Sequence, residues 1–143
     1  LLLVPGGGWV ARAAQGVRTE IAQGDLPHVI ARLHAERVTV AGVCTGAMLL
    51  AAAGVTTGRP AITHAGAMAD LRASGAAVIE ARVVDDGDLI TAGGVTSGLD
   101  LALWLVERFY GPALAHAVER QMEYERRGVV WRRDTTPPTG KGM

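Results

Sequence analysis

A run of uncharged, mostly β-branched residues that ends in a cysteine places the strongest constraint on the fold of this chain. The run from Val38 to Val43 has the composition of a strand that is buried on both faces. Cys44-Thr45-Gly46 follows, and then Ala47 to Ala53, a segment rich in helix formers. We therefore predict a central parallel strand that turns tightly into a helix at Cys44.

Strand and helix patterns alternate along the rest of the chain. Leu1 to Val4 is a short apolar run closed by Pro5-Gly6-Gly7-Gly8, and Trp9 to Gln23 has a helical pattern. Asp86-Gly87 predicts a hairpin turn, and Leu99 to Tyr110 predicts a further helix. Together these patterns predict an α/β fold, a flavodoxin-like three-layer sandwich with a mainly parallel central sheet.

Length and composition limit the number of domains and the kinds of partner. The 143 residues, 49% of them apolar, suit one α/β domain over residues 1–128, and we expect an irregular C-terminal tail over residues 129–143. The balance of 14 basic and 14 acidic residues gives no electrostatic reason to expect binding to nucleic acid or to a membrane. Apolar runs such as Ala47 to Val55 are too short to span a bilayer. We expect a cytoplasmic protein whose partners are a small-molecule substrate and a second copy of itself.

Cys44 is the candidate nucleophile, because a parallel sheet places its active crevice at the carboxyl ends of the strands. The N-terminus of the following helix favours negative charge, which would expose more thiolate. The alternative is an inert thiol, since free cysteine is often simply buried. The chain has one cysteine and so forms no internal disulfide.

Three further features bear on the chemistry of Cys44. The glycines after Pro5 end a second apolar strand, and their exposed amides could hold oxyanion charge, or they could simply form a turn. His64 follows another predicted strand as a candidate general base, with a packed or solvated histidine as the alternative. His116 and Glu119 lie three residues apart, but a metal site there would need more ligands than the sequence offers. We assign no metal and no cofactor.

The chain is similar to a known superfamily in several segments. These are Leu3 to Gly8, Ala41 to Ala47, Gly58 to His64, Arg82 to Leu103 and Gln121 to Tyr124. In order and spacing they resemble the ThiJ/PfpI superfamily, which has a class I glutamine amidotransferase-like fold, and most closely its isonitrile-hydratase-like branch.

This resemblance implies roles for particular residues. Cys44 would be the nucleophile, and the amides of Gly7 and Thr45 would lie at the oxyanion site. The residues implied to line the substrate pocket are Gly8, Trp9, Gly93, Gly94 and Val95. The implied activity is that of a cofactor-independent hydro-lyase that converts a small isonitrile and water to an N-substituted formamide. Peptidase-like members carry histidine directly after the cysteine, where this chain has Thr45, and the late His-x-Glu pair of amidotransferases is absent from the sequence.

One departure concerns the acidic residue that superfamily members place beside the cysteine. It would come from the part of the fold that precedes Leu1. Because the numbered chain starts inside an apolar run and without an initiator Met, we expect the N-terminal part of the domain to be missing from it. The alternatives to a hydratase are a glyoxalase-like or deglycase-like enzyme, a ligand sensor of the kind found in AraC-type regulators, and a sensor of oxidation at Cys44.

A homodimer is expected, since superfamily members commonly pair across helices that flank the active site. The predicted core stripe of the helix over residues 99–110 consists of Leu99, Ala102, Leu103, Val106 and Tyr110. This assignment leaves Leu101, Trp104 and Leu105 outside the core, as apolar surface for a partner. The alternative is that Val129 to Trp131 folds back over this surface within one chain.

Overall fold

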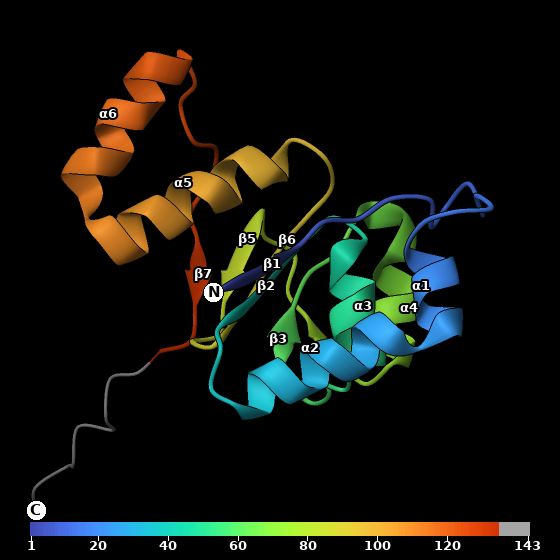
Figure 1. Ribbon diagram of the computed structural model, residues 1–143. Helices are drawn as coiled ribbons and strands as arrows, with labels where there is room; N and C mark the ends of the chain where they lie inside the picture. Colours follow the sequence, from blue (N-terminus) through green and yellow to red (C-terminus); the bar gives the residue numbers. More distant parts are fainter. Residues whose placement is uncertain (135–143) are drawn as a thin grey trace, which may run out of the picture.

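The computed structural model describes residues 1–134, with helices and strands alternating along most of the chain (Figure 1). The strands are β1 (Leu2–Val4), β2 (Val40–Val43), β3 (Pro60–Ala61), β4 (Ala77–Val78), β5 (Val83–Asp85), β6 (Leu89–Ala92) and β7 (Trp131–Arg132). The helices are α1 (Val17–Gln23), α2 (Asp25–Ala35), α3 (Gly46–Ala52), the 3-10 helix η1 (Ala65–Ala67), α4 (Met68–Ala73), α5 (Ser97–Tyr110) and α6 (Pro112–Met122).

A mostly parallel sheet lies at the centre of the molecule, in the order β1-β2-β6-β5-β7. β2 pairs in parallel with β1 and with β6, whereas β5 and β6 form the antiparallel hairpin predicted at Asp86-Gly87. A separate two-stranded sheet joins β3 to β4. The prediction of a flavodoxin-like α/β fold is thus confirmed.

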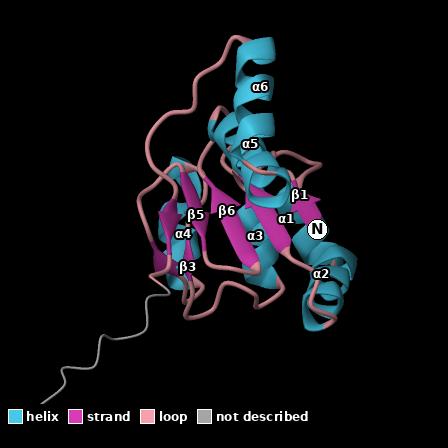
Figure 2. Cartoon of the chain, turned by 90° about the vertical axis from the view of Figure 1, so that its left-hand side faces the viewer, coloured by secondary structure: helices cyan, strands magenta, loops and turns pink. Residues whose placement is uncertain are grey.

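The two faces of the sheet are packed against different helices, which is the three-layer arrangement (Figure 2). Val40 and Leu89 are register partners that belong to the core cluster shared with α3. Their neighbours Ala41 and Ile90 belong to a second cluster, formed with α5. Because side chains alternate between the faces of a strand, each buried strand supplies both clusters.

The predicted helix from Trp9 to Gln23 is wrong over its first half. The helix begins only at Val17, and residues 9–16 form turns. Gly16 has a φ of 133°, and Val17 N–H donates to the carbonyl oxygen of Gly7. This contact ties the start of α1 to the glycine-rich loop, and Gly16 supplies a backbone angle that a helix excludes.

The predicted orientation of α5 is correct only for Leu103, which is buried, because the other residues of the predicted core stripe are not. Leu101, Trp104 and Leu105 are buried in the cluster beneath α5, while Leu99 and Tyr110 are exposed. Both sides of the helix are apolar, and α5 packs on the sheet and on α6 together. The spacing of apolar residues in the sequence therefore did not distinguish the side of α5 that faces the sheet.

The tail was predicted to be irregular from residue 129, but its first part contains β7. Trp131 is the register partner of Val84, and Val130 packs against the cluster beneath α5. The edge of β5 offers unpaired backbone groups, which β7 satisfies. The tail therefore returns to the sheet within one chain, which is the arrangement given above as the alternative to a homodimer. Residues 135–143, also predicted to be irregular, lie outside the described part.

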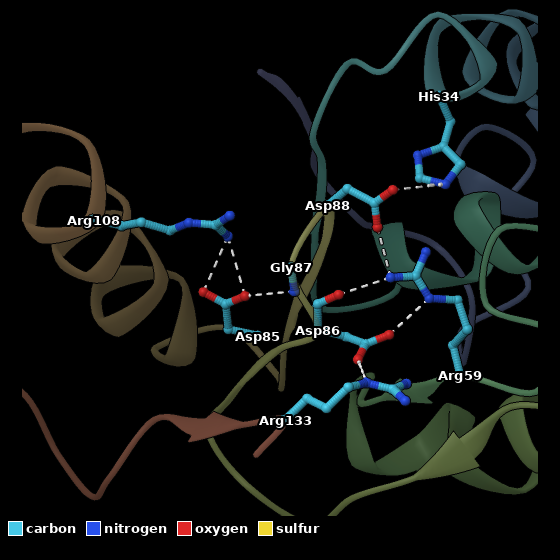
Figure 3. Close-up of polar contacts among 8 residues, drawn as sticks. All are labelled: His34, Arg59, Asp85, Asp86, Gly87, Asp88, Arg108 and Arg133. Carbon is cyan, nitrogen blue, oxygen red and sulfur yellow. Dashed lines mark hydrogen bonds and ion pairs between the residues drawn. The ribbon is translucent and has the colours of Figure 1, made fainter. Parts of the chain in front are cut away.

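Ion pairs hold together the β5–β6 turn, Asp85 to Asp88, which we call the hairpin edge (Figure 3). The Asp86 side chain, 1% exposed, accepts hydrogen bonds from Arg59 Nε at 2.7 Å and from Arg133 Nε. Asp85 accepts from Trp104 Nε1 at 2.8 Å and from Arg108 Nη1 at 3.1 Å. These bonds join the hairpin to α5 and to the segment after β7.

Among residues 1–134, none of the helices combines the length and the apolar character needed to cross a membrane.

Candidate active site

Cys44 lies at the carboxyl end of β2 in a backbone conformation that is rare for any residue other than glycine. Its φ is 57°, in the left-handed region, and the thiol is partly exposed. Its N–H donates to the carbonyl oxygens of Ala92 and Gly93, at 3.1 Å each, and its carbonyl oxygen accepts from Thr63 Oγ1 at 2.9 Å. Neighbouring segments thus hold Cys44 in a strained turn of the kind that presents nucleophiles.

The turn after Cys44 leaves no space for a side chain at the first residue of α3. A Cβ atom on Gly46 would lie 2.1 Å from the carbonyl oxygen of Val4 and 2.8 Å from that of Pro5. The end of β1 therefore passes directly over the start of α3. Glycine at this position is required by close approach of two backbones.

The glycine-rich loop after β1 contacts the Cys44 turn, as predicted from the sequence. Gly7 N–H donates to Thr45 Oγ1 at 2.9 Å, and a Cβ atom on Gly6 would lie 2.5 Å from Thr45 N. The structure therefore brings Gly7 and Thr45 together. In this arrangement the Gly7 amide is bonded to the threonine hydroxyl.

His64 lies at the same edge of the sheet and caps η1. Its Nδ1 accepts a hydrogen bond from Gly66 N–H at 3.0 Å. In a neutral imidazole this bond assigns the proton to Nε2, so Nε2 acts as a donor. His64 also packs against the loop after β6, because a Cβ atom on Gly94 would lie 2.5 Å from its Cδ2 atom.

A small cavity of about 300 Å³ opens at this edge of the sheet. It is lined by Ile62, Thr63, Ala65, Met68, Glu80, Ala81, Arg82, Gly93, Gly94 and Ser97. Gly93 and Gly94 are thus in the wall, whereas Cys44, Thr45, Gly7 and His64 do not belong to the lining. Val95 is 76% exposed with a φ of 36°, and it does not belong to the lining.

Two of the residues predicted to bind substrate lie elsewhere. Trp9 is only 9% exposed, and its Nε1 donates to Asp70 Oδ2 at 2.8 Å while Arg18 stacks on the ring at 3.9 Å. The Cα of Gly8 faces Gln15, whose carbonyl oxygen would be 2.8 Å from a Cβ atom there. Neither residue lines the cavity, and Trp9 contributes to the core beneath the glycine-rich loop.

A polar cluster behind the cavity, of which Arg82 alone belongs to the lining, was not predicted from the sequence. Arg82 Nε donates to Asp100 Oδ2 at 2.7 Å, and this hydrogen bond raises the pKa of Arg82 above its usual value. Asp100 also accepts from Tyr124 Oη at 3.2 Å and from Arg127 N–H at 2.8 Å. Asp100, an acidic residue directly before the apolar run from Leu101 to Val106, was the one signal available.

Two other features do not form part of this site. A larger hollow of about 860 Å³ lies at the hairpin edge, lined in part by Asp85, Trp104 and Arg108, whose polar groups bond to one another. Within residues 1–134 there is no group of three or more His, Cys, Asp or Glu side chains that could hold a metal ion.

Known proteins are similar to this chain both in sequence and in fold. The DJ-1/PfpI family matches residues 1–108. The isonitrile hydratase of Pseudomonas putida is 44% identical over 85 residues, which are 59% of this chain and 37% of that protein. The HTH-type transcriptional regulator CdhR of Pseudomonas aeruginosa is 36% identical over 92 residues, 63% of this chain and 27% of the regulator. The chain therefore spans well under half the length of these relatives.

Solved structures extend the comparison to the whole chain. A ThiJ/PfpI family protein from Pseudomonas syringae has a TM-score of 0.73 and 27% identity, over 100% of this chain and 54% of the other. An AraC family transcriptional regulator from Pseudomonas putida has a TM-score of 0.64 and 27% identity, over 68% of this chain and 54% of the other. The strained Cys44 turn, the adjoining glycine loops and these matches lead to one conclusion: the chain belongs to the DJ-1/PfpI family.

Proposed function

We propose that this chain carries the catalytic cysteine of a hydro-lyase that adds water to small isonitriles. The observation that supports this most directly is the strained position of Cys44 at the carboxyl edge of the sheet, one hydrogen bond away from the wall of the cavity. The 44% identity to an isonitrile hydratase supports the choice of reaction. Nucleophilic catalysis suits it, since a covalent intermediate divides a difficult hydration into two easier steps.

The reaction balances without any oxidant or reductant. The Cys44 thiolate forms a C–S bond with the terminal carbon of the isonitrile, and that carbon takes a proton to give a thioimidate. Water then adds to the same carbon. The C=O bond forms as the C–S bond breaks, and the thiolate leaves with its electron pair. One proton of the water ends on the nitrogen of the N-substituted formamide, and the other is released and replaces the proton that the carbon took.

Backbone amides and one imidazole would assist these steps. The amide of Thr45 is next to the nucleophile, and the Gly7 amide joins it once the Thr45 hydroxyl rotates away. His64 Nε2–H would donate a hydrogen bond at the same edge. Gly93 and Gly94 would contact the substrate in the cavity wall. Val95 would lie at the outer rim of the cavity, and Gly8 and Trp9 would lie behind the Cys44 turn.

The direct test is incubation of purified protein with an aliphatic isonitrile, with the formamide measured by chromatography and mass spectrometry. Formation of the N-formyl product in proportion to enzyme supports the proposal. Its absence at high enzyme concentration eliminates the hydratase. Turnover of methylglyoxal in a parallel assay would instead favour the glyoxalase-like or deglycase-like alternative.

A second candidate is a sensor domain that binds a ligand without turnover. It is favoured by the 36% identity to the regulator CdhR and by the structural match to an AraC family regulator. A sensor would bind small molecules at the cavity, and a Cys44→Ala variant would keep this affinity. Measurement of formamide release beside ligand affinity separates the two candidates.

Self-association is part of the proposal. Leu101, Trp104 and Leu105 are buried within the chain, so the surface for a second copy would instead include Leu99, Phe109 and Tyr110 on α5, all exposed. Light scattering at micromolar concentration would give twice 14.9 kDa for the homodimer, whereas 14.9 kDa would eliminate it. A cytoplasmic location is proposed as well, because a reducing compartment preserves a reactive thiol.

A further inference from the structure

We propose that the cavity binds the apolar body of a neutral ligand and that Arg82 donates a hydrogen bond to an acceptor atom on it. This inference rests on the proposed function, since it specifies the substrate class of the same site. A volume of about 300 Å³ admits only a small molecule, because ligand pockets usually range from about 300 to 1,000 Å³.

The walls of the cavity are mainly apolar. Ile62, Ala65, Met68 and Ala81 contribute apolar side chains, and the glycine loop after β6 contributes bare backbone. The Thr63 hydroxyl already donates to the Cys44 carbonyl oxygen. Most of the binding free energy of a ligand would therefore come from burial of its hydrocarbon part, and few polar groups would orient it.

Arg82 is the cationic side chain in this wall, and it is held in place. Its Nε lies 2.7 Å and its Nη2 2.6 Å from Asp100 Oδ2, and Nη2 is 3.2 Å from Thr96 Oγ1. None of these bonds uses Nη1. Besides Asp100, Tyr124 also interacts with the guanidinium and contributes to its raised pKa. The guanidinium is thus held in place, and we assign Nη1, which the bonds to Asp100 and Thr96 do not use, to the ligand.

The charge of Arg82 is balanced by the protein, which argues for a neutral ligand. Asp100 is 2% exposed, so the pair is shielded from water on the carboxylate side. Glu80 also lines the cavity, but its side chain is 74% exposed and lies 3.5 Å from Arg72. With these charges paired, a carboxylate on the ligand would gain little beyond what a neutral oxygen gains.

The donor is connected to the nucleophile through the backbone. Arg82 carbonyl oxygen accepts from Gly93 N–H at 3.0 Å, and Gly93 carbonyl oxygen accepts from Cys44 N–H at 3.1 Å. Arg82 therefore keeps a fixed relation to the Cys44 turn. Cys44 itself does not line the cavity, so a substrate would reach the thiol past the Gly93 loop with its other end near Arg82, and Arg82 would then be a determinant of specificity.

The test is calorimetric titration with three formamides of similar size: N-butylformamide, N-formylglycine methyl ester and N-formylglycine. We expect the ester to bind about tenfold more tightly than the butyl compound, the effect of one hydrogen bond to a charged donor. The free acid should bind no more tightly than the ester. Arg82→Met should remove the preference for the ester, while Arg32→Met, at an exposed arginine on α2, should retain it.

Equal affinity of the unaltered protein for the ester and the butyl compound would overturn the inference, as would tighter binding of the free acid or no binding of any of the three. This comparison requires no variant, so it decides the matter even if Arg82→Met does not fold. Binding of formamides needs no turnover. A protein that prefers the ester but hydrates no isonitrile keeps this inference and loses the proposed function.

Discussion

The carboxyl ends of the central strands, which we call the Cys44 edge, differ from the hairpin edge in how their turns are built. In the turns that follow β2 and β6, Cys44 and Val95 have positive φ, 57° and 36°, although neither is a glycine. At the hairpin edge, the turn uses Gly87 at 87°, where glycine adopts the conformation without strain. The hairpin edge also gathers ion pairs around Asp85 and Asp86 (Figure 3).

This contrast shows where the fold accepts strain and where it is stabilised. A residue in an unfavourable backbone region costs about 1–3 kcal/mol and persists only where its surroundings fix it. Here the neighbouring loops fix Cys44 through three hydrogen bonds. Substitutions at the Cys44 edge should therefore change activity, stability or both, whereas substitutions at the hairpin edge should change stability alone.

The largest effect is expected from Cys44→Ser. This change is nearly isosteric but replaces the thiolate with a poor nucleophile, so the rate should fall by at least about a thousandfold. The melting temperature should change little. The measurement is formamide release beside thermal unfolding, and full activity in this variant would show that Cys44 is structural.

Gly46→Ala should destabilise the Cys44 edge by steric overlap. The new Cβ atom would lie 2.1 Å from the Val4 carbonyl oxygen, and a loss of about 3 kcal/mol in the free energy of unfolding follows. Gly54→Ala is the matched control, because its φ of 77° brings strain but no atom lies within 4 Å. Urea denaturation should show the smaller loss there, about 1 kcal/mol. Equal losses would contradict the close contact of β1 with α3.

Asp86→Asn should lower stability while leaving the rate per folded molecule unchanged. The substitution removes the charge of a buried carboxylate that pairs with two arginines, which should cost about 2 kcal/mol. This is less than the usual cost of about 3–5 kcal/mol for breaking a buried pair, because the Arg133 side chain is 56% exposed. Chemical denaturation gives the stability, and the assay for formamide gives the rate. A large fall in the rate would contradict the claim that the hairpin edge contributes to stability alone.

The same carboxylate predicts a dependence of stability on pH. Burial alone would raise the pKa of Asp86, but hydrogen bonds from Arg133 and Arg59 outweigh it and hold the pKa below the ordinary value. Its stabilisation is therefore complete above the pKa of an unfolded aspartate, about 3.9, and is lost as the pH falls below that value. Asp86→Asn should flatten this part of the pH profile.

His64→Ala should lower the rate by about tenfold, far less than the cysteine change, because a single assisting hydrogen bond is lost. His64→Asn separates chemistry from capping, since asparagine can still accept the hydrogen bond from Gly66 N–H. If Asn restores the rate, His64 acts as a cap. A loss as complete as that of the cysteine variant would instead make His64 a catalytic base.

The smallest effect is expected at Val95. A β-branched residue at a φ of 36° is strained, and its side chain is 76% exposed. Val95→Asn should raise the free energy of unfolding by about 0.5–1 kcal/mol, because asparagine tolerates this region better. Thermal unfolding measures the gain, and a loss of stability would show that the valine side chain makes a contact that outweighs the strain.

Local patterns in the sequence were sufficient for much of the fold and for the position of Cys44 at the end of a strand. The β-branched run before Cys44 predicted β2, Asp86-Gly87 predicted the hairpin, and the pattern from Leu99 to Tyr110 predicted α5. These features depend on backbone preferences within a few residues. The glycine loop at Gly7 was likewise expected near Cys44, since both follow parallel strands.

Other features depended on contacts between distant segments. Arg82 and Asp100 are 18 residues apart and meet only because the hairpin returns beneath α5. Trp9 was predicted to bind substrate, but its hydrogen bond to Asp70, 61 residues away, fixes it in the core. No local pattern encodes such pairings, so the Arg82–Asp100 pair beside the cavity could not be predicted.

The sequence by itself determined that strands and helices alternate and that a cysteine ends the central strand, because periodicity and backbone preference act locally. Only the tertiary structure decided which side of α5 is buried. Both Leu99 and Leu101 are apolar, and packing against the sheet and α6 together selected Leu101. The physical reason is that burial depends on the shape of the neighbouring layers, which no single segment contains.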